Sequence, residues 1–271
     1  GAPLKGILNE LYTYLIEPLE EELSSAEVVT IIPSGNLYYV PWGALLDAEG
    51  DSLIFLSERY NWNILTSTEL WKCTQRREGK HKRLRSLVLV GNPAGSDLPL
   101  EYAEGEVTSI EQFYPNSTIL TGIEATEPQV ISITPQGQAL HLATHCNLDT
   151  ESPWESYIQL ARTDSTDGKW TMSEVSGQSW GKMQLVTLSA CQTALGGERP
   201  GLEFISMATA FSLAIEGPPS IVATLWKVHD ESTKELMVTF YEELKRNPKS
   251  EALRLAQQKL IHSDKYAHPF F

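Results

Sequence analysis

Cysteine is scarce in this chain, and its scarcity excludes one class of protein. The 271 residues contain three cysteines, Cys73, Cys146 and Cys191, at irregular spacing. An odd, irregular set of cysteines does not suit a disulfide framework and is typical of reduced thiols. The simplest interpretation of any one of them is a small buried hydrophobic side chain. We therefore expect a cytoplasmic protein rather than a small disulfide-stapled secreted domain.

Long hydrophobic runs are also missing. The longest apolar stretches, such as that from Pro218 to Trp226, are far shorter than the roughly 20 residues that cross a bilayer. Residues 1–5 lack the charged and apolar regions of a secretory signal peptide. We expect neither a membrane segment nor export.

Basic residues are outnumbered by acidic ones. The chain has 21 Lys and Arg against 35 Asp and Glu, a formal net charge of -14. Its one basic cluster, residues 76–85, has no interleaved aromatic residue for base stacking, so we expect no direct nucleic-acid binding. The cluster is typical of a solvated loop between an N-terminal subregion, 1–80, and a second subregion, 81–271, of one domain. The acidic balance favours basic partners.

The pattern of apolar residues predicts an α/β fold. With an apolar content of 41%, a chain of 271 residues can bury one large core or two small ones, and we expect one compact unit. The first subregion is predicted to contain a helix at 4–23 and strands at 28–32 and 37–40 around the turn 33–36. The second alternates strands (86–90, 118–120, 139–144, 185–188, 220–225) with helices (98–113, 128–133, 201–215, 231–246), with a polar loop after 144. This order predicts a mostly parallel sheet with helices on both faces, a three-layer sandwich.

His145 and Cys191 each stand at the end of a predicted strand. If the two strands are parallel neighbours, both residues lie at the carboxyl edge of one sheet, where open α/β sheets bind ligands. A thiol of pKa about 8.5 is only a few per cent thiolate at neutral pH, so it needs a proton acceptor, which an imidazole provides. A thiol, an imidazole and backbone N–H groups for an oxyanion are sufficient for nucleophilic attack on a carbonyl.

Three motifs carry a family resemblance: His-Leu-Ala-Thr-His at 141–145, Leu-Ser-Ala-Cys-Gln-Thr-Ala-Leu-Gly at 188–196 and Val-Ala-Thr-Leu-Trp-Lys-Val-His-Asp at 222–230. With the segments 31–47, 98–106 and 251–257 they resemble the CHAT family of caspase-like peptidases, which belongs with separase, the caspases and the gingipains. The resemblance implies that Cys191 is the nucleophile and His145 the general base and later the general acid. It also implies that the N–H groups of Cys146 and Cys191 hold the oxyanion, with no metal or organic cofactor.

The chain departs from the family pattern in two places. The residue after the histidine is Cys146, where the family has glycine, so a Cβ stands near the substrate carbonyl and glycine's freedom at positive φ is lost. Activity is then lowered or gated, or Cys146 forms a disulfide with Cys191 under oxidation, although disulfide geometry is strict. The chain also stops at Phe271, whereas family members continue to a further strand, so we expect that strand and any upstream sensor repeats to be missing from this sequence.

Four residues are candidates for substrate binding. Ser189 faces the same side of its strand as Cys191, a position that looks into the S1 pocket of relatives, and Trp226 resembles the tryptophan that lines this pocket. Asp149 and Glu203 are candidate acidic walls. Three of these residues also have a purely structural interpretation. Asp149 can form a turn, Glu203 can be an acid at the start of a helix and Trp226 can be a core tryptophan.

Other chemistry-bearing residues have simpler interpretations. We expect His141 to be a packed, hydrogen-bonded core histidine and Asp230 to be a helix N-cap. A zinc site of His141, His145, Cys146 and Cys191 is disfavoured, because His-x-x-x-His-Cys matches no common zinc pattern.

The residues and the resemblance together predict a caspase-like cysteine endopeptidase that cleaves a specific protein substrate. Loops 162–170 and 196–201 are rich in Gly, Asp, Ser and Thr, which favours latency until a partner orders them. The resemblance implies a sensor such as tetratricopeptide repeats outside this chain, which shows no repeat of about 34 residues. The alternative is an impaired pseudoprotease that binds peptides; an esterase is disfavoured because a Gly-x-Ser-x-Gly motif is missing. Some prokaryotic relatives act in antiviral defence.

Overall fold

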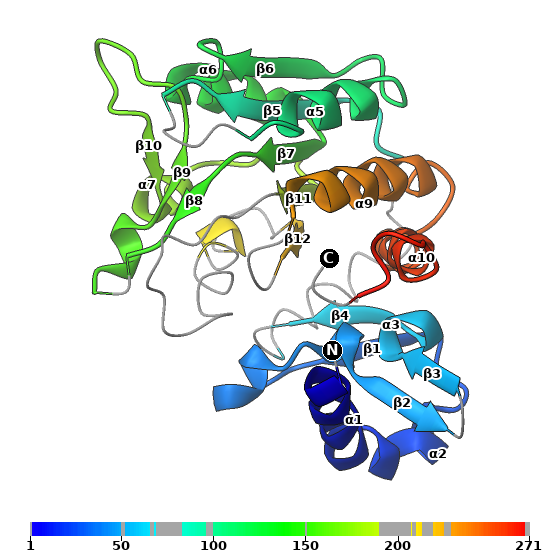
Figure 1. Cartoon of the computed structure of the whole chain (residues 1–271). Coiled ribbons are helices and arrows are strands. Elements are labelled where there is room, and N and C mark those ends of the chain that lie inside the picture. Colours follow the sequence, from blue (N-terminus) through cyan, green and yellow to red (C-terminus); the bar gives the residue numbers. More distant parts are fainter. Residues whose placement is uncertain are drawn as a thin grey trace. The chain divides into compact units, whose positions relative to one another are not determined.

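The structure, a computed structural model, describes residues 2–49, 52–65, 68, 83–95, 100–149, 151–189, 207, 210–212, 219–224 and 229–268. The chain divides into two compact units (Figure 1). One contains residues 1–81 and 246–270, and the other contains residues 82–245. The segment 246–270 thus belongs with the N-terminal residues, although it follows the second unit in sequence.

The first unit is built from short elements around one long helix. In chain order these are helix α1 (Ala2–Leu15), 3-10 helix η1 (Glu17–Leu19), α2 (Glu20–Leu23), strand β1 (Val28–Ile31), 3-10 helices η2 (Gly35–Tyr39) and η3 (Trp42–Ala44), the hairpin β2 (Leu46–Glu49) and β3 (Ser52–Phe55), α3 (Leu56–Arg59), β4 (Asn61–Ile64) and α10 (Lys249–Ile261). Tyr12 and Ile16 lie one helical turn apart and pack against Trp42, Leu45 and Leu56. Helical spacing of apolar side chains therefore fixes the inner face of α1.

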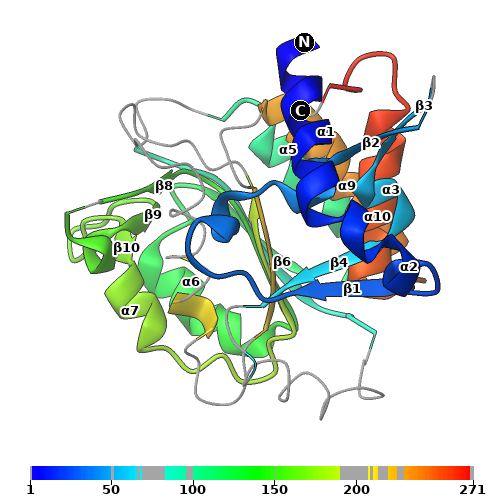
Figure 2. The same cartoon turned by 90° about the horizontal axis from the view of Figure 1, so that it is seen from below.

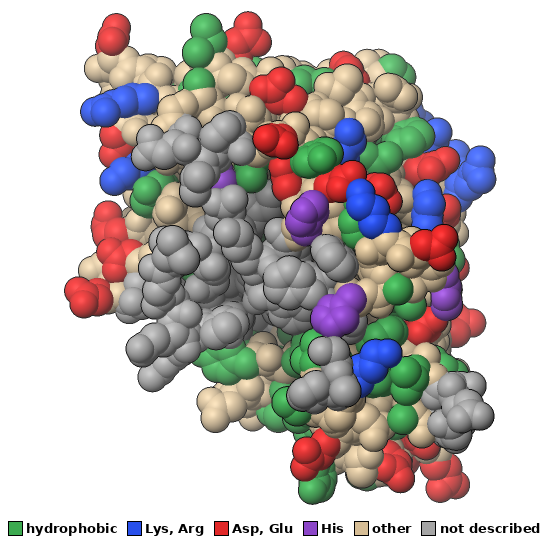
Figure 3. Space-filling view, in the orientation of Figure 1, with side chains coloured by type: hydrophobic (Ala, Val, Ile, Leu, Met, Phe, Trp, Pro, Cys, Tyr) green, Lys and Arg blue, Asp and Glu red, His purple; other side chains and the backbone are tan. Residues whose placement is uncertain are grey.

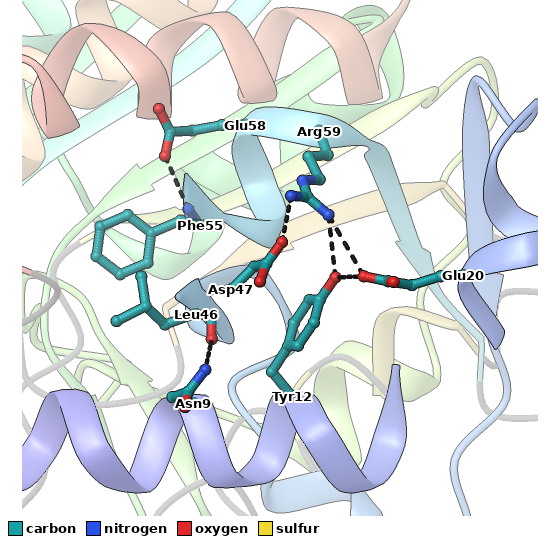
Figure 4. A network of polar contacts seen from close by, with 8 residues as sticks. All are labelled: Asn9, Tyr12, Glu20, Leu46, Asp47, Phe55, Glu58 and Arg59. Carbon is teal, nitrogen blue, oxygen red and sulfur yellow. Dashed lines mark hydrogen bonds and ion pairs between the residues drawn. The ribbon is translucent and has the colours of Figure 1, made fainter. Parts of the chain in front are cut away.

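A polar network also joins the elements of this unit (Figure 4). Arg59 forms an ion pair with Asp47 and donates a hydrogen bond to the hydroxyl of Tyr12 at 3.0 Å. That hydroxyl also contacts the carboxylate of Glu20. The Arg59 side chain is only 26% exposed. The guanidinium thus links α1, the start of α2 and the β2–β3 hairpin.

Two predictions for this unit are wrong. Residues 37–40 lie in and just after η2 rather than in a strand, because β1 pairs in parallel with β4 and not with the next segment. The predicted helix 4–23 is interrupted after Leu15, where Pro18 stands at the start of η1. Proline lacks the N–H that an α-helix interior needs and its ring clashes with the preceding turn.

The second unit contains a five-stranded parallel sheet. Its strand order is β12 (Ser220–Ala223), β11 (Leu185–Ser189), β7 (Ala139–Ala143), β5 (Leu87–Pro93) and β6 (Thr118–Gly122). Every neighbouring pair is parallel. Helices α5 (Ala103–Glu111) and α9 (Asp230–Glu243) pack together on one face, and α6 (Glu127–Ile133) and α7 (Met172–Ser176) lie on the other (Figure 2). The predicted α/β class with helices on both faces is confirmed.

Alternation along the central strands explains both layers of the core. Leu140 and Leu142 of β7 join a cluster with Trp170 and Phe211. The intervening His141 faces α5 and α9 instead. Its ring packs edge-on against that of Tyr241 of α9, with the two ring centroids 5.3 Å apart. Every residue of β7 and β11 is buried. Strands buried on both faces read as near-continuous apolar runs, which is why the sequence predicts them well.

The predicted polar loop after residue 144 is wrong in part. It contains a three-stranded antiparallel sheet of β8 (Cys146–Asn147), β9 (Tyr157–Gln159) and β10 (Lys169–Thr171), with 3-10 helix η5 (Pro153–Glu155) before β9. Strands of two or three residues carry too little periodicity to be recognised. Gly168 has a φ of +75°, and a Cβ there would lie 2.6 Å from the carbonyl oxygen of Leu160. Glycine therefore permits the close approach that starts β10.

The surface reflects the composition. Acidic side chains are spread over the face shown in Figure 3, where Lys and Arg are fewer. In residues 2–49, Lys5 is the only basic residue. Across the described ranges, the helices are too short or too polar to traverse a lipid bilayer.

Candidate active site at the carboxyl edge of the sheet

His145 follows β7, and the neighbouring strand β9 holds its backbone. The hydroxyl of Thr144 donates to the carbonyl oxygen of Gln159 at 2.6 Å. The N–H of Gln159 donates to the carbonyl oxygen of His145 at 2.8 Å. His145 is buried, with 7% of its surface exposed. Two hydrogen bonds to the backbone of Gln159 therefore hold the chain segment that carries the imidazole.

Cys146 follows and pairs with Ile158 of β9. Because the Gln159 N–H bonds to the residue before Cys146, the Cys146–Ile158 pair is a non-hydrogen-bonded pair of the antiparallel ladder. The N–H of Cys146 thus points away from β9. Its side chain joins the hydrophobic cluster around Leu142 and Trp170. Cys146 does not have a positive φ, so a residue with a Cβ stands at this position without backbone strain.

Strand β11 pairs in parallel with β7, and the spacing between paired residues can be compared with that between His145 and Cys191. Each residue of β7 pairs with the residue 46 positions later, as Ala143 pairs with Ser189 (189 minus 143). His145 and Cys191 are separated by the same interval. Cys191 lies outside the described residues, so its contact with His145 stays a prediction. Glu203, Trp226 and Cys73 also lie outside them.

Ser189 is part of a buried polar cluster with Glu106 of α5 and His141 of β7. The Ser189 hydroxyl donates to Oε1 of Glu106 at 2.6 Å, and Nε2 of His141 lies 2.7 Å from the same oxygen. All three residues are 0% exposed. The expectation of a hydrogen-bonded core histidine at His141 is confirmed. The Ser189 hydroxyl thus has a structural partner in Glu106. Its role in a substrate pocket stays a prediction.

Asp149 lies in a turn after β8. Its Oδ1 accepts hydrogen bonds from the N–H groups of Glu151 at 2.9 Å and Ser152 at 2.8 Å. Its own N–H donates to the hydroxyl of Ser156 at 3.0 Å. These contacts are those of a turn-forming aspartate. A substrate-binding role for its carboxylate stays a prediction.

Asp230 has a different role from the predicted one. It is the first residue of α9, and His229 takes the N-cap position. Its Oδ2 instead accepts the N–H of Tyr102, the N-cap residue of α5, at 2.9 Å. The first N–H groups of a helix lack partners within it, so a carboxylate from a neighbouring helix satisfies one here.

The charge of Asp230 interacts with the candidate site. Burial raises the pKa of its carboxyl group, while the Tyr102 N–H lowers it. The charge of Glu106 raises this pKa further, and the charges of His229 and His145 lower it. Neither acid is among the site residues that the sequence predicts. The available signal was Glu106 itself, three residues after Ala103 on the apolar face of a predicted helix.

The family model described as "CHAT domain" matches residues 5–271. The chain belongs to the CHAT-domain family. This family is related to the caspase-like cysteine peptidases, and the five-stranded parallel sheet of this CHAT domain is consistent with that fold. A search of curated proteins finds no match. In the parts of the CHAT domain that the structure describes, no group of three or more His, Cys, Asp or Glu side chains is placed to hold a metal ion.

Proposed function

We propose that this CHAT domain is a cysteine endopeptidase in which Cys191 and His145 form the catalytic dyad. The observation that carries the proposal is the register of β7 and β11, in which partners are 46 residues apart, as His145 and Cys191 are. Neighbouring strands lie about 4.8 Å apart, a distance that lets a thiol and an imidazole on adjacent strand ends form a hydrogen bond.

The chemistry follows from these two groups. His145 accepts the thiol proton of Cys191, and the thiolate sulfur attacks the carbonyl carbon of the scissile peptide bond. The C–N bond breaks as His145 transfers its proton to the leaving amine, which leaves an acyl thioester on the sulfur. His145 then takes a proton from water, the resulting hydroxide attacks the thioester, and the carboxylic acid product and the thiol are released.

Two backbone N–H groups are proposed to stabilise the oxyanion, those of Cys146 and Cys191. The pairing of β8 with β9 supports the role of Cys146. Its N–H points away from β9 and makes no hydrogen bond within the Cys146–Ile158 pair. Preorganised donors of this kind are worth about 10²–10³-fold in rate each. Activation by a sensor outside this chain stays a prediction.

The test is covalent labelling with a library of peptidyl acyloxymethyl ketones, read by intact mass. A thiolate displaces the carboxylate of such a ketone and forms one thioether. We expect one adduct on the reduced wild-type protein and none on Cys191→Ala or His145→Ala. Cys73→Ser, which removes a thiol outside the proposed dyad, is the matched control and should label like the wild type.

Two results would contradict the proposal. An adduct that survives Cys191→Ala would show that another thiol reacts. A wild-type protein that binds the peptides without forming any adduct, also when upstream sequence is supplied, would instead indicate a peptide-binding module.

A further inference from the structure

Glu106 is an acid on an otherwise apolar helix face. Its neighbours on that face of α5 are Ala103, Val107 and Ile110, and all four residues are 0% exposed. Burying a carboxyl group is unfavourable unless hydrogen bonds compensate for the lost water. The partners of Glu106 come from two different strands, Ser189 from β11 and His141 from β7.

Both partners bind the same oxygen, Oε1 of Glu106. Ser189 pairs with Ala143, and Cys191 and His145 each stand two residues further along the sequence. Glu106 therefore ties Ser189, the last described residue of β11, to His141 in the middle of β7. Among the described residues, its other oxygen, Oε2, and Nδ1 of His141 have no hydrogen-bond partner.

A close contact of the backbone brings α5 within reach of this cluster. A Cβ on Gly91 of β5 would lie 2.8 Å from Cγ2 of Val107 and 3.1 Å from the carbonyl oxygen of Ala103. Any larger residue would push α5 away from the sheet. Glycine at 91 thus sets the depth at which the Glu106 carboxyl group sits.

We propose that Glu106 is a positioning residue for the dyad, tying the end of β11 at Ser189 to β7 so that Cys191 stays within hydrogen-bond reach of His145. This inference rests on the proposed function. Backbone hydrogen bonds fix the two strands only as far as the ladder extends, which in the described residues is the pair Ala143–Ser189. The Glu106 cluster adds a side-chain tie between Ser189 of that last pair and His141 of β7. Loss of it is expected to misplace the thiol, and a shift of about 1 Å in a catalytic group can cost about 10²-fold in rate.

The test measures the alkylation rate of Cys191 by iodoacetamide from pH 5 to 10, with the modified peptide quantified by mass spectrometry. This readout reports the thiolate and needs no substrate or partner. We expect Glu106→Ala to lower the rate at pH 7 roughly 100-fold and to move the midpoint towards the value near 8.5 of a free thiol. Ser189→Ala, which removes one of the two ties, should lose roughly 10-fold. Glu106→Gln keeps an acceptor oxygen but replaces charge-assisted hydrogen bonds with weaker neutral ones, so it should lie between Glu106→Ala and wild type.

The matched control is Tyr241→Phe. It removes the buried hydrogen bond between the Tyr241 and Thr187 hydroxyl groups at 2.9 Å, on the same side of the sheet, and keeps the ring that packs against His141. It should lower the thermal midpoint and leave the alkylation profile unchanged. If Glu106→Ala does not fold, Ser189→Ala and Glu106→Gln, which remove less, carry the comparison.

The outcomes separate this inference from the proposed dyad. If the wild type and His145→Ala have the same pH dependence of Cys191 alkylation, both the proposed dyad and this inference are wrong. A dyad that depends on His145 but is unaffected in the Glu106 and Ser189 variants would overturn only the positioning role. Normal alkylation combined with selective loss of labelling by peptidyl ketones with a basic P1 residue would also overturn it, and would assign Glu106 to substrate recognition.

Discussion

The contact between Gly91 and Val107 allows a sharp thermodynamic test of how α5 is seated. In Gly91→Ala the new methyl group would lie 2.8 Å from Cγ2 and 3.2 Å from Cγ1 of Val107, both well inside ordinary van der Waals contact. Overpacking of this kind typically costs about 1–3 kcal/mol. Val107 is 0% exposed, so Val107→Ala alone should cost about 2 kcal/mol through lost burial and a cavity.

The double variant distinguishes this argument from a general loss of stability. With Val107 shortened, the methyl group of Gly91→Ala occupies the vacated space, so the two costs should not add. We expect a favourable coupling of at least about 1 kcal/mol, which is the range seen for residues in contact. In a domain of this size, 1 kcal/mol corresponds to roughly 2–4 °C in the thermal midpoint.

The assay is urea unfolding of the four proteins of the cycle, followed by tryptophan fluorescence and circular dichroism. Gly177→Ala is the control, because a Cβ there would meet only the carbonyl oxygens of Glu174 at 3.6 Å and Ser173 at 3.8 Å, both ordinary contacts. A Gly91→Ala protein as stable as Gly177→Ala would show that the close contact with Val107 carries no cost. An equal cost of Val107→Ala in the free energy of unfolding in both backgrounds would show that the two residues do not interact.

Three further predictions follow from single contacts. Burial raises the pKa of Tyr114 from 10.0 to about 12, so its contribution to stability is present below pH 10 and lost as the pH rises through 12; Tyr114→Phe should flatten that loss in urea titrations across this range. Gly168→Ala should cost more than about 2 kcal/mol, because it combines a positive φ with a backbone clash, and its urea midpoint should fall accordingly. Cys146→Gly should lower stability by about 1–2 kcal/mol through loss of a core side chain without increasing Cys191 labelling; a gain in labelling would show that the side chain obstructs the site.

The parallel sheet could be predicted because its strands carry their own signal. Residues 139–143 and 185–189 are buried on both faces, so each appears as a largely apolar run interrupted only by His141, Thr187 and Ser189. The position of His145 at the end of the first run follows directly from that pattern. His141 was predicted correctly for a related reason, since a polar residue within a buried strand needs a hydrogen-bond partner.

The features that could not be predicted depend on partners far away in sequence. Asp230 reads locally as a helix cap, yet its carboxylate accepts a hydrogen bond from Tyr102, 128 residues earlier. Glu106 binds Ser189, 83 residues later, and no local pattern identifies that partner. The strands β8 to β10 exist through their pairing with one another rather than through their own length. Local patterns therefore predict the scaffold, while the surroundings of the candidate site depend on tertiary contacts.

The return of α10 to the first unit has a consequence for synthesis on the ribosome. Arg254 donates to Asn61 at 2.9 Å, Gln258 donates to the carbonyl oxygen of Glu58 at 3.0 Å, and Ile261 packs against the cluster of Leu8 and Phe55. The first 81 residues therefore emerge without the helix that completes their core. At about 5–20 residues per second, roughly 10–40 s pass before that helix follows. During this interval the nascent N-terminal segment exposes apolar side chains that the finished unit buries, so we expect chaperones to bind it while translation continues.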